Sequence, residues 1–135
     1  MRPDDLDAVI AIDHQAAGCD RGRLLKMLAD AGRIHVLLRE GAVAGYAVSR
    51  LFGQGYVVGP VVADDLAGAR QLIEAALSCL QGCFVRIDTA AVEKLSPWLA
   101  EIGLAQVGNA LTMVKGDMPP TGRARIFALA SQSFN

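Results

Sequence analysis

The N-terminal half of the chain changes from a helical to a strand-like pattern of apolar residues. Over residues 4–17 the apolar positions recur every three or four residues behind an early proline and several acids, which predicts a helix. Asp20 begins a second helix of this kind, which should end near Gly32. The apolar period then becomes two, which predicts one strand over residues 33–39 and another over residues 43–52.

The middle of the chain combines strands with one strongly amphipathic helix. A third strand is predicted over residues 56–62, and Gly59-Pro60 interrupts it because proline has no N–H to donate to a ladder. Apolar residues form one stripe over residues 66–80 and polar residues form the other, which predicts a helix. A short strand over residues 83–88 follows. We expect this strand, helix and strand to form a parallel crossover.

Shorter signals follow in the last third of the chain. A serine and a proline at 96–97 start a helix, residues 104–115 have the pattern of a long strand, and residues 125–130 could form a final strand. Strands joined by tight turns should be antiparallel. We therefore predict a mixed α/β sheet in a single domain that spans residues 1–135.

Composition narrows the possible classes of function. Hydrophobic residues make up 53% of the chain and charged residues 20%, so a packed core is expected. The formal net charge of −1 leaves no basic excess for phosphates, which argues against a nucleic-acid binder. No apolar run approaches the roughly 20 residues that span a bilayer, and no signal peptide is evident. We expect a cytoplasmic protein with no membrane partner.

The chain has three cysteines, Cys19, Cys79 and Cys83. Because their number is odd and their spacing shows no pairing pattern, we expect reduced thiols. Two of them are four residues apart, but without a second pair of ligands they are weak evidence for zinc, and no metal is predicted. We expect all three to be small buried hydrophobic residues, as free cysteines usually are.

Short motifs along the chain, at their observed spacings, resemble the GNAT (Gcn5-related) N-acetyltransferase superfamily. More narrowly, they resemble the second domain of YitH-like two-domain acetyltransferases. The motifs are Asp20-Arg21, Gly45-Tyr46, Arg50, Gly59-Pro60, Ala63, Asp88-Thr89, Trp98-Leu99, Gly103-Leu104, Met113-Val114, Gly116 and the run from Phe127 to Ala130. This resemblance implies an α/β, GNAT-like (acyl-CoA N-acyltransferase) mixed sheet with antiparallel N-terminal strands, a central βαβ unit and flanking helices. The usual first strand of the superfamily is missing or nearly so, as in an open-start copy or one half of a longer relative.

The resemblance also implies acetyl-CoA as co-substrate. In GNAT domains it lies where two central parallel strands splay into a V, and its pantetheine amides pair with the backbone of the bulged strand. The residues that the resemblance assigns to acetyl-CoA here are Gly59, Pro60, Val61, Val62, Ala63 and Gly68. A proline-broken strand at the start of a βαβ unit leaves unpaired backbone groups beside a switch point, which agrees with this assignment. A simple edge bulge is the alternative.

The chain departs from the family pattern at two places. Family enzymes hold the pyrophosphate with an Arg/Gln-x-x-Gly-x-Gly/Ala loop, but here the loop is shorter, with Asp65 in place of the first residue and Arg70 in place of the second glycine. Asp64 and Asp65 either cap the following helix or, as negative charges, repel a pyrophosphate. The tyrosine that protonates the leaving thiolate in many family enzymes is replaced by Leu99, so the catalytic residues are unknown.

Polar residues at the strand ends are the candidates for substrate binding. Asp88 ends a strand at the carboxyl edge of the βαβ unit, where ligands of open α/β sheets bind, and Asp20 and Arg21 should face the same end. Arg50 could pair with a substrate carboxylate, and an aspartate could orient or deprotonate an amine. The alternative is an arginine–aspartate pair that holds loops in place.

Two functions are compatible with these features. The leading one is a GNAT-family N-acetyltransferase that moves an acetyl group from acetyl-CoA to a small-molecule amine. The alternative is a non-catalytic, degenerate GNAT-like module that binds a metabolite or docks against a partner domain. Because uncovered strand edges invite pairing, we also expect a homodimer, formed through residues 33–40 or through the strand at 104–115.

Overall fold

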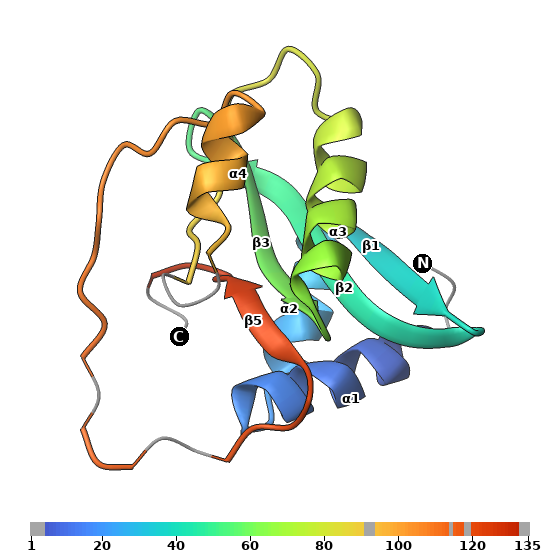
Figure 1. The fold of residues 1–135 in the computed structure, drawn as a ribbon. Coiled ribbons are helices and arrows are strands. Elements are labelled where there is room, and N and C mark those ends of the chain that lie inside the picture. Colours follow the sequence, from blue (N-terminus) through green and yellow to red (C-terminus); the bar gives the residue numbers. More distant parts are fainter. Residues whose placement is uncertain (1–4, 91–93, 114, 118–119, 133–135) are drawn as a thin grey trace.

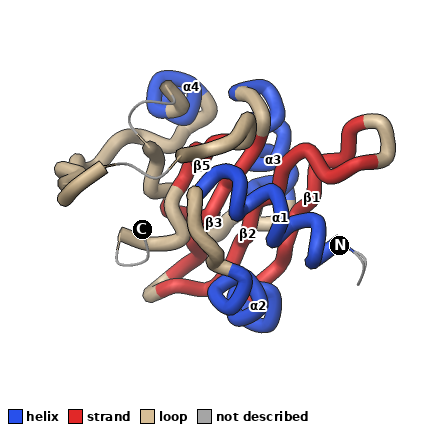
Figure 2. The backbone as a smooth tube through the Cα atoms, turned by 90° about the horizontal axis from the view of Figure 1, so that it is seen from below, coloured by secondary structure: helices blue, strands red, loops and turns tan. Residues whose placement is uncertain are grey.

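The computed structural model describes residues 5–90, 94–113, 115–117 and 120–132, which form one mixed sheet with helices on both faces (Figures 1 and 2). The elements, in chain order, are α1 (Asp5–Ala17), α2 (Gly22–Ala31), β1 (Gly32–Arg39), β2 (Ala42–Phe52), β3 (Gly55–Ala63), α3 (Leu66–Ser78), β4 (Val85–Arg86), α4 (Ser96–Glu101) and β5 (Arg125–Ala128). The first three strands and all four helices agree with the predicted elements to within a few residues.

The sheet combines an antiparallel and a parallel part. Its strand order is β1-β2-β3-β4, and β5 pairs with β3. The pairs β1–β2, β2–β3 and β3–β5 are antiparallel, whereas β3 and β4 are parallel and pair at Tyr56↔Val85 and Val57↔Arg86. The antiparallel start and the central βαβ unit are thus confirmed, and with them the mixed α/β fold.

Alternating side chains of the central strands build one core on each face of the sheet. Ala47 and Val58 point toward α3, where they pack with Ile73. Tyr46 and Val48 point to the opposite face, where they pack against α1 and α2. Figure 2, seen from below, shows α1 and α2 crossing the sheet on the side away from α3. Each large apolar side chain that is fully buried in this way contributes about 1.5–3 kcal/mol to folding.

The prediction of a long strand over residues 104–115 is wrong, as far as the structure describes these residues. Residues 104–113 and 115 have no regular secondary structure, and Val114 lies outside the described residues. Val107, Leu111 and Met113 are exposed, and Figure 1 shows this orange segment passing outside the sheet. A strand needs a neighbour for its backbone groups. The following strand, β5, does not provide one, because it pairs with β3 instead.

The strand predicted over residues 83–88 is shortened for a related reason. Its paired part is β4, Val85–Arg86, because the edge of β3 beyond Val57 is occupied by β5.

The cysteines are also placed differently from the prediction. All three are free thiols, but they are exposed rather than buried, since they lie at or beyond helix ends and in the turn that follows α3. Among the described residues, no group of three or more histidines, cysteines and carboxylates could hold a metal ion. No helix in the described part of the chain is long and apolar enough to cross a bilayer.

Candidate functional site

The predicted interruption of β3 is present at Gly59-Pro60. This peptide bond is cis, and the register between β2 and β3 shifts opposite it. On one side of the shift Ser49 pairs with Val58, and on the other Ala47 pairs with Val61. The bulge therefore lies in the middle of the sheet, and the edge of β3 that it shares with β4 is the edge assigned to acetyl-CoA by the family resemblance.

Beyond the bulge, β3 and β4 separate and β5 lies between them. The parallel ladder with β4 ends at Val57, and farther along the same strand Val61 pairs with Ala128 and Ala63 pairs with Arg125. In Figure 1 the red strand β5 runs beside the lower part of β3. The two parallel strands diverge as the resemblance implies, but a strand of the same chain occupies the opening.

The other edge of β5 is bonded to the residues that follow β4. The Leu129 N–H donates to the Asp88 carbonyl oxygen at 2.8 Å, and the Ala90 N–H donates to the Phe127 carbonyl oxygen at 3.0 Å. The Phe127 side chain is 2% exposed, within the core beneath α3. The Leu129 carbonyl approaches Gly59 so closely that a Cβ at this position would collide with it. With β5 in place, the β3 edge does not fit the pantetheine of acetyl-CoA.

The start of α3, which corresponds to the pyrophosphate loop of the family pattern, carries a carboxylate. Asp65 is the N-cap, and its Oδ1 accepts the Gly68 N–H at 2.7 Å. Two hydrogen bonds of 2.8 and 3.0 Å join Asp65 to the Arg39 guanidinium of β1. These bonds to Arg39, together with the Gly68 N–H, hold the pKa of Asp65 below its ordinary value. The capping role is therefore filled: the Gly68 N–H is already bonded, and a pyrophosphate here would meet a negative charge.

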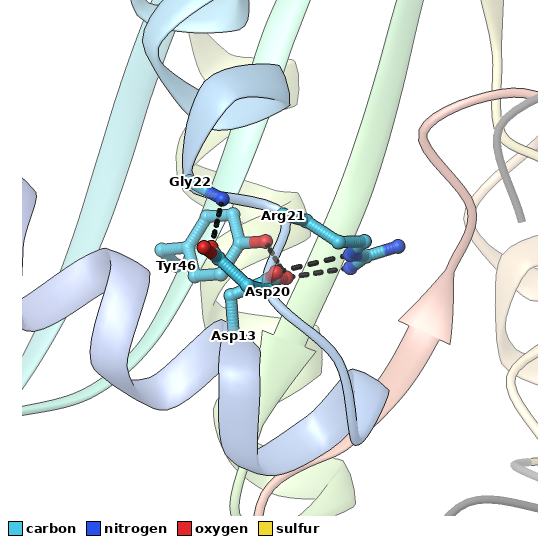
Figure 3. A network of polar contacts seen from close by, with 5 residues as sticks. All are labelled: Asp13, Asp20, Arg21, Gly22 and Tyr46. Carbon is cyan, nitrogen blue, oxygen red and sulfur yellow. Dashed lines mark hydrogen bonds and ion pairs between the residues drawn. The ribbon is translucent and has the colours of Figure 1, made fainter.

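The predicted substrate residue Arg21 belongs to a buried network, shown in Figure 3. Its Nε and Nη2 donate to Asp13 at 3.0 and 2.5 Å, and the Tyr46 hydroxyl donates to the same carboxylate at 2.5 Å. Asp13 and Tyr46 are both 0% exposed. Burial, followed by the charge of Asp13, raises the pKa of Tyr46 well above its ordinary value, so its phenol is a hydrogen-bond donor at neutral pH. Asp20 lies beside this network and accepts the Gly22 N–H at 2.8 Å.

This network joins α1, the start of α2 and β2. Asp13 was missed by the sequence reasoning, although a signal was present. It shares a face of α1 with Val9 and Ala16, and a carboxylate within an apolar stripe needs a buried partner. Its partners could not be identified from the sequence, because Tyr46 lies 33 residues away.

Arg50 and Asp88, the other two predicted substrate residues, lie in a second polar cluster formed by β2, β4 and the residues directly after β4. The Arg50 and Arg86 guanidiniums lie 5.2 and 4.6 Å from the centre of the Phe52 ring. Arg50 donates to the Ala130 carbonyl oxygen at 2.8 Å. Asp88 forms an ion pair with Arg86 at 3.2 Å, without the alignment of a hydrogen bond. Burial and the nearby Arg86 charge lower the pKa of Arg50.

Neither Arg86 nor Phe52 of this second cluster was singled out from the sequence. Two guanidiniums and one carboxylate leave a net positive charge, which suits an anionic group. The cluster is partly open to solvent, since the Arg86 side chain is 41% exposed.

A separate cavity of about 610 Å³ lies between β1 and α3. Its lining includes residues 33–38 of β1, Gln71 and Ala75 of α3, Cys79 directly after α3, and Asp5. None of the residues predicted to bind acetyl-CoA or the amine lines this cavity. It follows the free edge of the sheet rather than the bulge of β3.

Comparison with models of known protein families gives a match. A family model described as an acetyltransferase (GNAT) domain matches residues 9–128, which include most of α1 and all of β5. Searches of curated proteins and of solved structures returned no match.

Proposed function

The chain belongs to the GNAT acetyltransferase domains, and from that membership we propose that it transfers an acetyl group from acetyl-CoA to a small-molecule amine. The family match over residues 9–128 is the observation that carries the proposal. The bulge at Gly59-Pro60 and the separation of β3 from β4 beyond Val57 support it.

For substrate binding we propose Arg50 and Asp88, which the sequence suggested, together with Arg86. These three residues lie in one partly exposed cluster, whereas the Arg21 guanidinium is already committed to Asp13. An amine that also carries a carboxylate would pair with the arginines. Asp20 lies at the start of α2, and its carboxylate already accepts the Gly22 N–H.

The test is release of free CoA thiol from acetyl-CoA with a panel of small amines, with and without a carboxylate, and mass spectrometry of the products. Thiol release should depend on the amine and should be faster for amines with a carboxylate. Arg50→Met should raise KM for such an amine more than it lowers kcat. Arg23→Met is the matched control, because Arg23 is an exposed arginine of α2. Absence of amine-dependent thiol release for the whole panel would count against the proposal.

A second candidate function is a non-catalytic GNAT module that binds a metabolite or docks against a partner domain. Asp65 is the observation in its favour, since its carboxylate occupies the helix end where a pyrophosphate would bind. In this case acetyl-CoA should not raise the melting temperature of the protein. A ligand present at 100 times its Kd would otherwise add about 2.7 kcal/mol to the free energy of unfolding.

Asp65→Asn separates the two functions. Asparagine caps a helix about as well as aspartate but carries no charge. If the domain binds acetyl-CoA, the variant should bind it more tightly than the parent protein does. If the domain is a non-catalytic module, acetyl-CoA should stabilise neither protein.

We also propose that the protein acts in the cytoplasm as a homodimer. The three exposed free thiols suit a reducing compartment. β1 is an edge strand of the sheet, and among the described residues no strand pairs with its outer edge, which could pair with a second copy. The alternative dimer contact, the strand expected at 104–115, does not form in the described residues.

A further inference from the structure

We propose that the C-terminal segment, residues 124–130, regulates the acetyl-CoA site by occupying it, so that acetyl-CoA binds after this segment has left β3. The proposal rests on the proposed function, because it concerns the co-substrate of the same site. Its basis is that the segment and the pantetheine require the same edge of β3.

The competition follows from the pairing of β3. The antiparallel pairs from Val61↔Ala128 to Ala63↔Arg125 use the backbone edge of β3 beyond the bulge. Beside the bulge, the Leu129 carbonyl fills the space next to Gly59. A backbone group that is bonded to β5 cannot bond to a pantetheine amide at the same time, so the two occupants exclude each other.

The segment is held by a short ladder that is irregular on both sides. β5 has four residues, and its register with β3 shifts between Val61 and Val62. On its other edge Ala128 bridges to Thr89, the Leu129 N–H donates to Asp88, and the Phe127 carbonyl oxygen accepts from Ala90. The Arg50 side chain also donates to the Ala130 carbonyl oxygen. Residues 104–113, which precede it, form no strand that would fix its position. Such a segment can leave without separating β1, β2 and β3 from one another.

The buried side chains of the segment favour the closed arrangement when no co-substrate is present. Phe127 is 2% exposed, and Ala124, Ala128 and Ala130 are each 0% exposed. The segment also covers an edge of β3 that would otherwise have unpaired backbone groups. Because the open state is a minor fraction, the apparent Kd for acetyl-CoA is the intrinsic Kd divided by that fraction. The segment therefore sets the affinity of the site.

A reversible cross-link between β3 and β5 tests the proposal in the full chain. Val62 and Ile126 are register neighbours, so the double variant Val62→Cys/Ile126→Cys can form a disulfide that locks the segment. The control lock is Ile34→Cys/Val48→Cys, which joins β1 to β2 and leaves the β3 edge unchanged. In both proteins the native thiols are replaced by serine, at Cys19, Cys79 and Cys83.

Calorimetry with acetyl-CoA should show binding at least about tenfold weaker for the oxidised β3–β5 lock than for the same protein after reduction. The control lock should bind equally well in both states. Equal affinity of the oxidised and reduced β3–β5 lock would overturn the proposal. Absence of binding to the parent protein, to both reduced proteins and to the control lock would refute the proposed function itself, and the regulatory role with it.

Hydrogen exchange of the parent protein gives a second readout that does not depend on the cross-link. Acetyl-CoA should accelerate exchange of the Leu129 and Ala90 amides, because both lose their partners when the segment leaves. Amides of the β1–β2 ladder should be unaffected. Slower exchange at Leu129 and Ala90 with bound acetyl-CoA would show that the segment stays in place and would contradict the proposal.

Discussion

Replacement of Arg21 by methionine should destabilise the fold strongly, although the sequence suggested a role in substrate binding. Arg21 donates two hydrogen bonds to Asp13, a carboxylate that is 0% exposed. Methionine preserves much of the side-chain volume but removes both donors. The Tyr46 hydroxyl then remains as a donor to a buried negative charge.

The expected loss is about 3–5 kcal/mol, the usual cost of removing one partner of a buried ion pair. Such a loss is a large part of the 5–15 kcal/mol by which a typical domain is stable. Tyr46→Phe removes one hydrogen bond to the same carboxylate while the ion pair remains. Its expected cost is smaller, about 1.5–3 kcal/mol.

Urea unfolding followed by circular dichroism measures both effects, provided that the slope against urea is unchanged. Arg23→Met is the matched control, since it makes the same substitution at an exposed position of α2 two residues away. It should change the free energy of unfolding by less than about 0.5 kcal/mol. If Arg21→Met behaves like this control while ligand binding is lost, the buried-network reasoning is wrong and Arg21 is a binding residue.

Four further results are expected. Calorimetry should give a Kd for acetyl-CoA in the high micromolar range or weaker, on the order of −5 to −6 kcal/mol, and a low-micromolar value would show that neither β5 nor Asp65 obstructs the site. Light scattering at high micromolar concentration should detect a homodimer, and a monomer would contradict pairing through β1. Melting curves should place Asp88→Asn within about 1 kcal/mol of the parent, because its partner Arg86 is 41% exposed, whereas a loss of about 3–5 kcal/mol would mean that the pair holds the fold. The pKa of Tyr46 is raised in the folded state, so the stability that depends on it should be constant below pH 10.0 and should fall at higher pH, and Tyr46→Phe should remove that fall.

The elements that could be predicted from the sequence are those whose signals are local. α3 has a clear amphipathic stripe, and the tight turns between β1, β2 and β3 fix their antiparallel pairing. The segment 104–113 has a strand pattern as well, but whether it forms a strand depends on a neighbouring strand from elsewhere in the chain. Once β5 pairs with β3, that neighbour is missing, and no periodicity within 104–113 reveals this.

The candidate site shows the same division between local and distant information. The capping role of Asp65 was available from the sequence, because two aspartates precede an apolar helix. The ion pair with Arg39 was not, since the two residues are 26 positions apart and meet through the packing of α3 on β1. Likewise the ion-pair partner of Asp88 is Arg86, two residues earlier in the chain, which was not singled out from the sequence.

Two features of this structure oppose different parts of acetyl-CoA. Asp65 opposes the pyrophosphate through its charge, and its own partner is the Arg39 guanidinium. β5 opposes the pantetheine through the backbone of β3, which no change of charge relieves. Asp64 forms an ion pair with Arg123 at 3.8 Å, just before the C-terminal segment. Since the Arg123 side chain is 80% exposed, that pair couples the start of α3 to this segment weakly. Release of β5 would therefore uncover the strand edge while leaving the negative charge at α3. For a catalytic role, β5 must move and the pyrophosphate of acetyl-CoA must bind despite the negative charge of Asp65. A non-catalytic module requires neither.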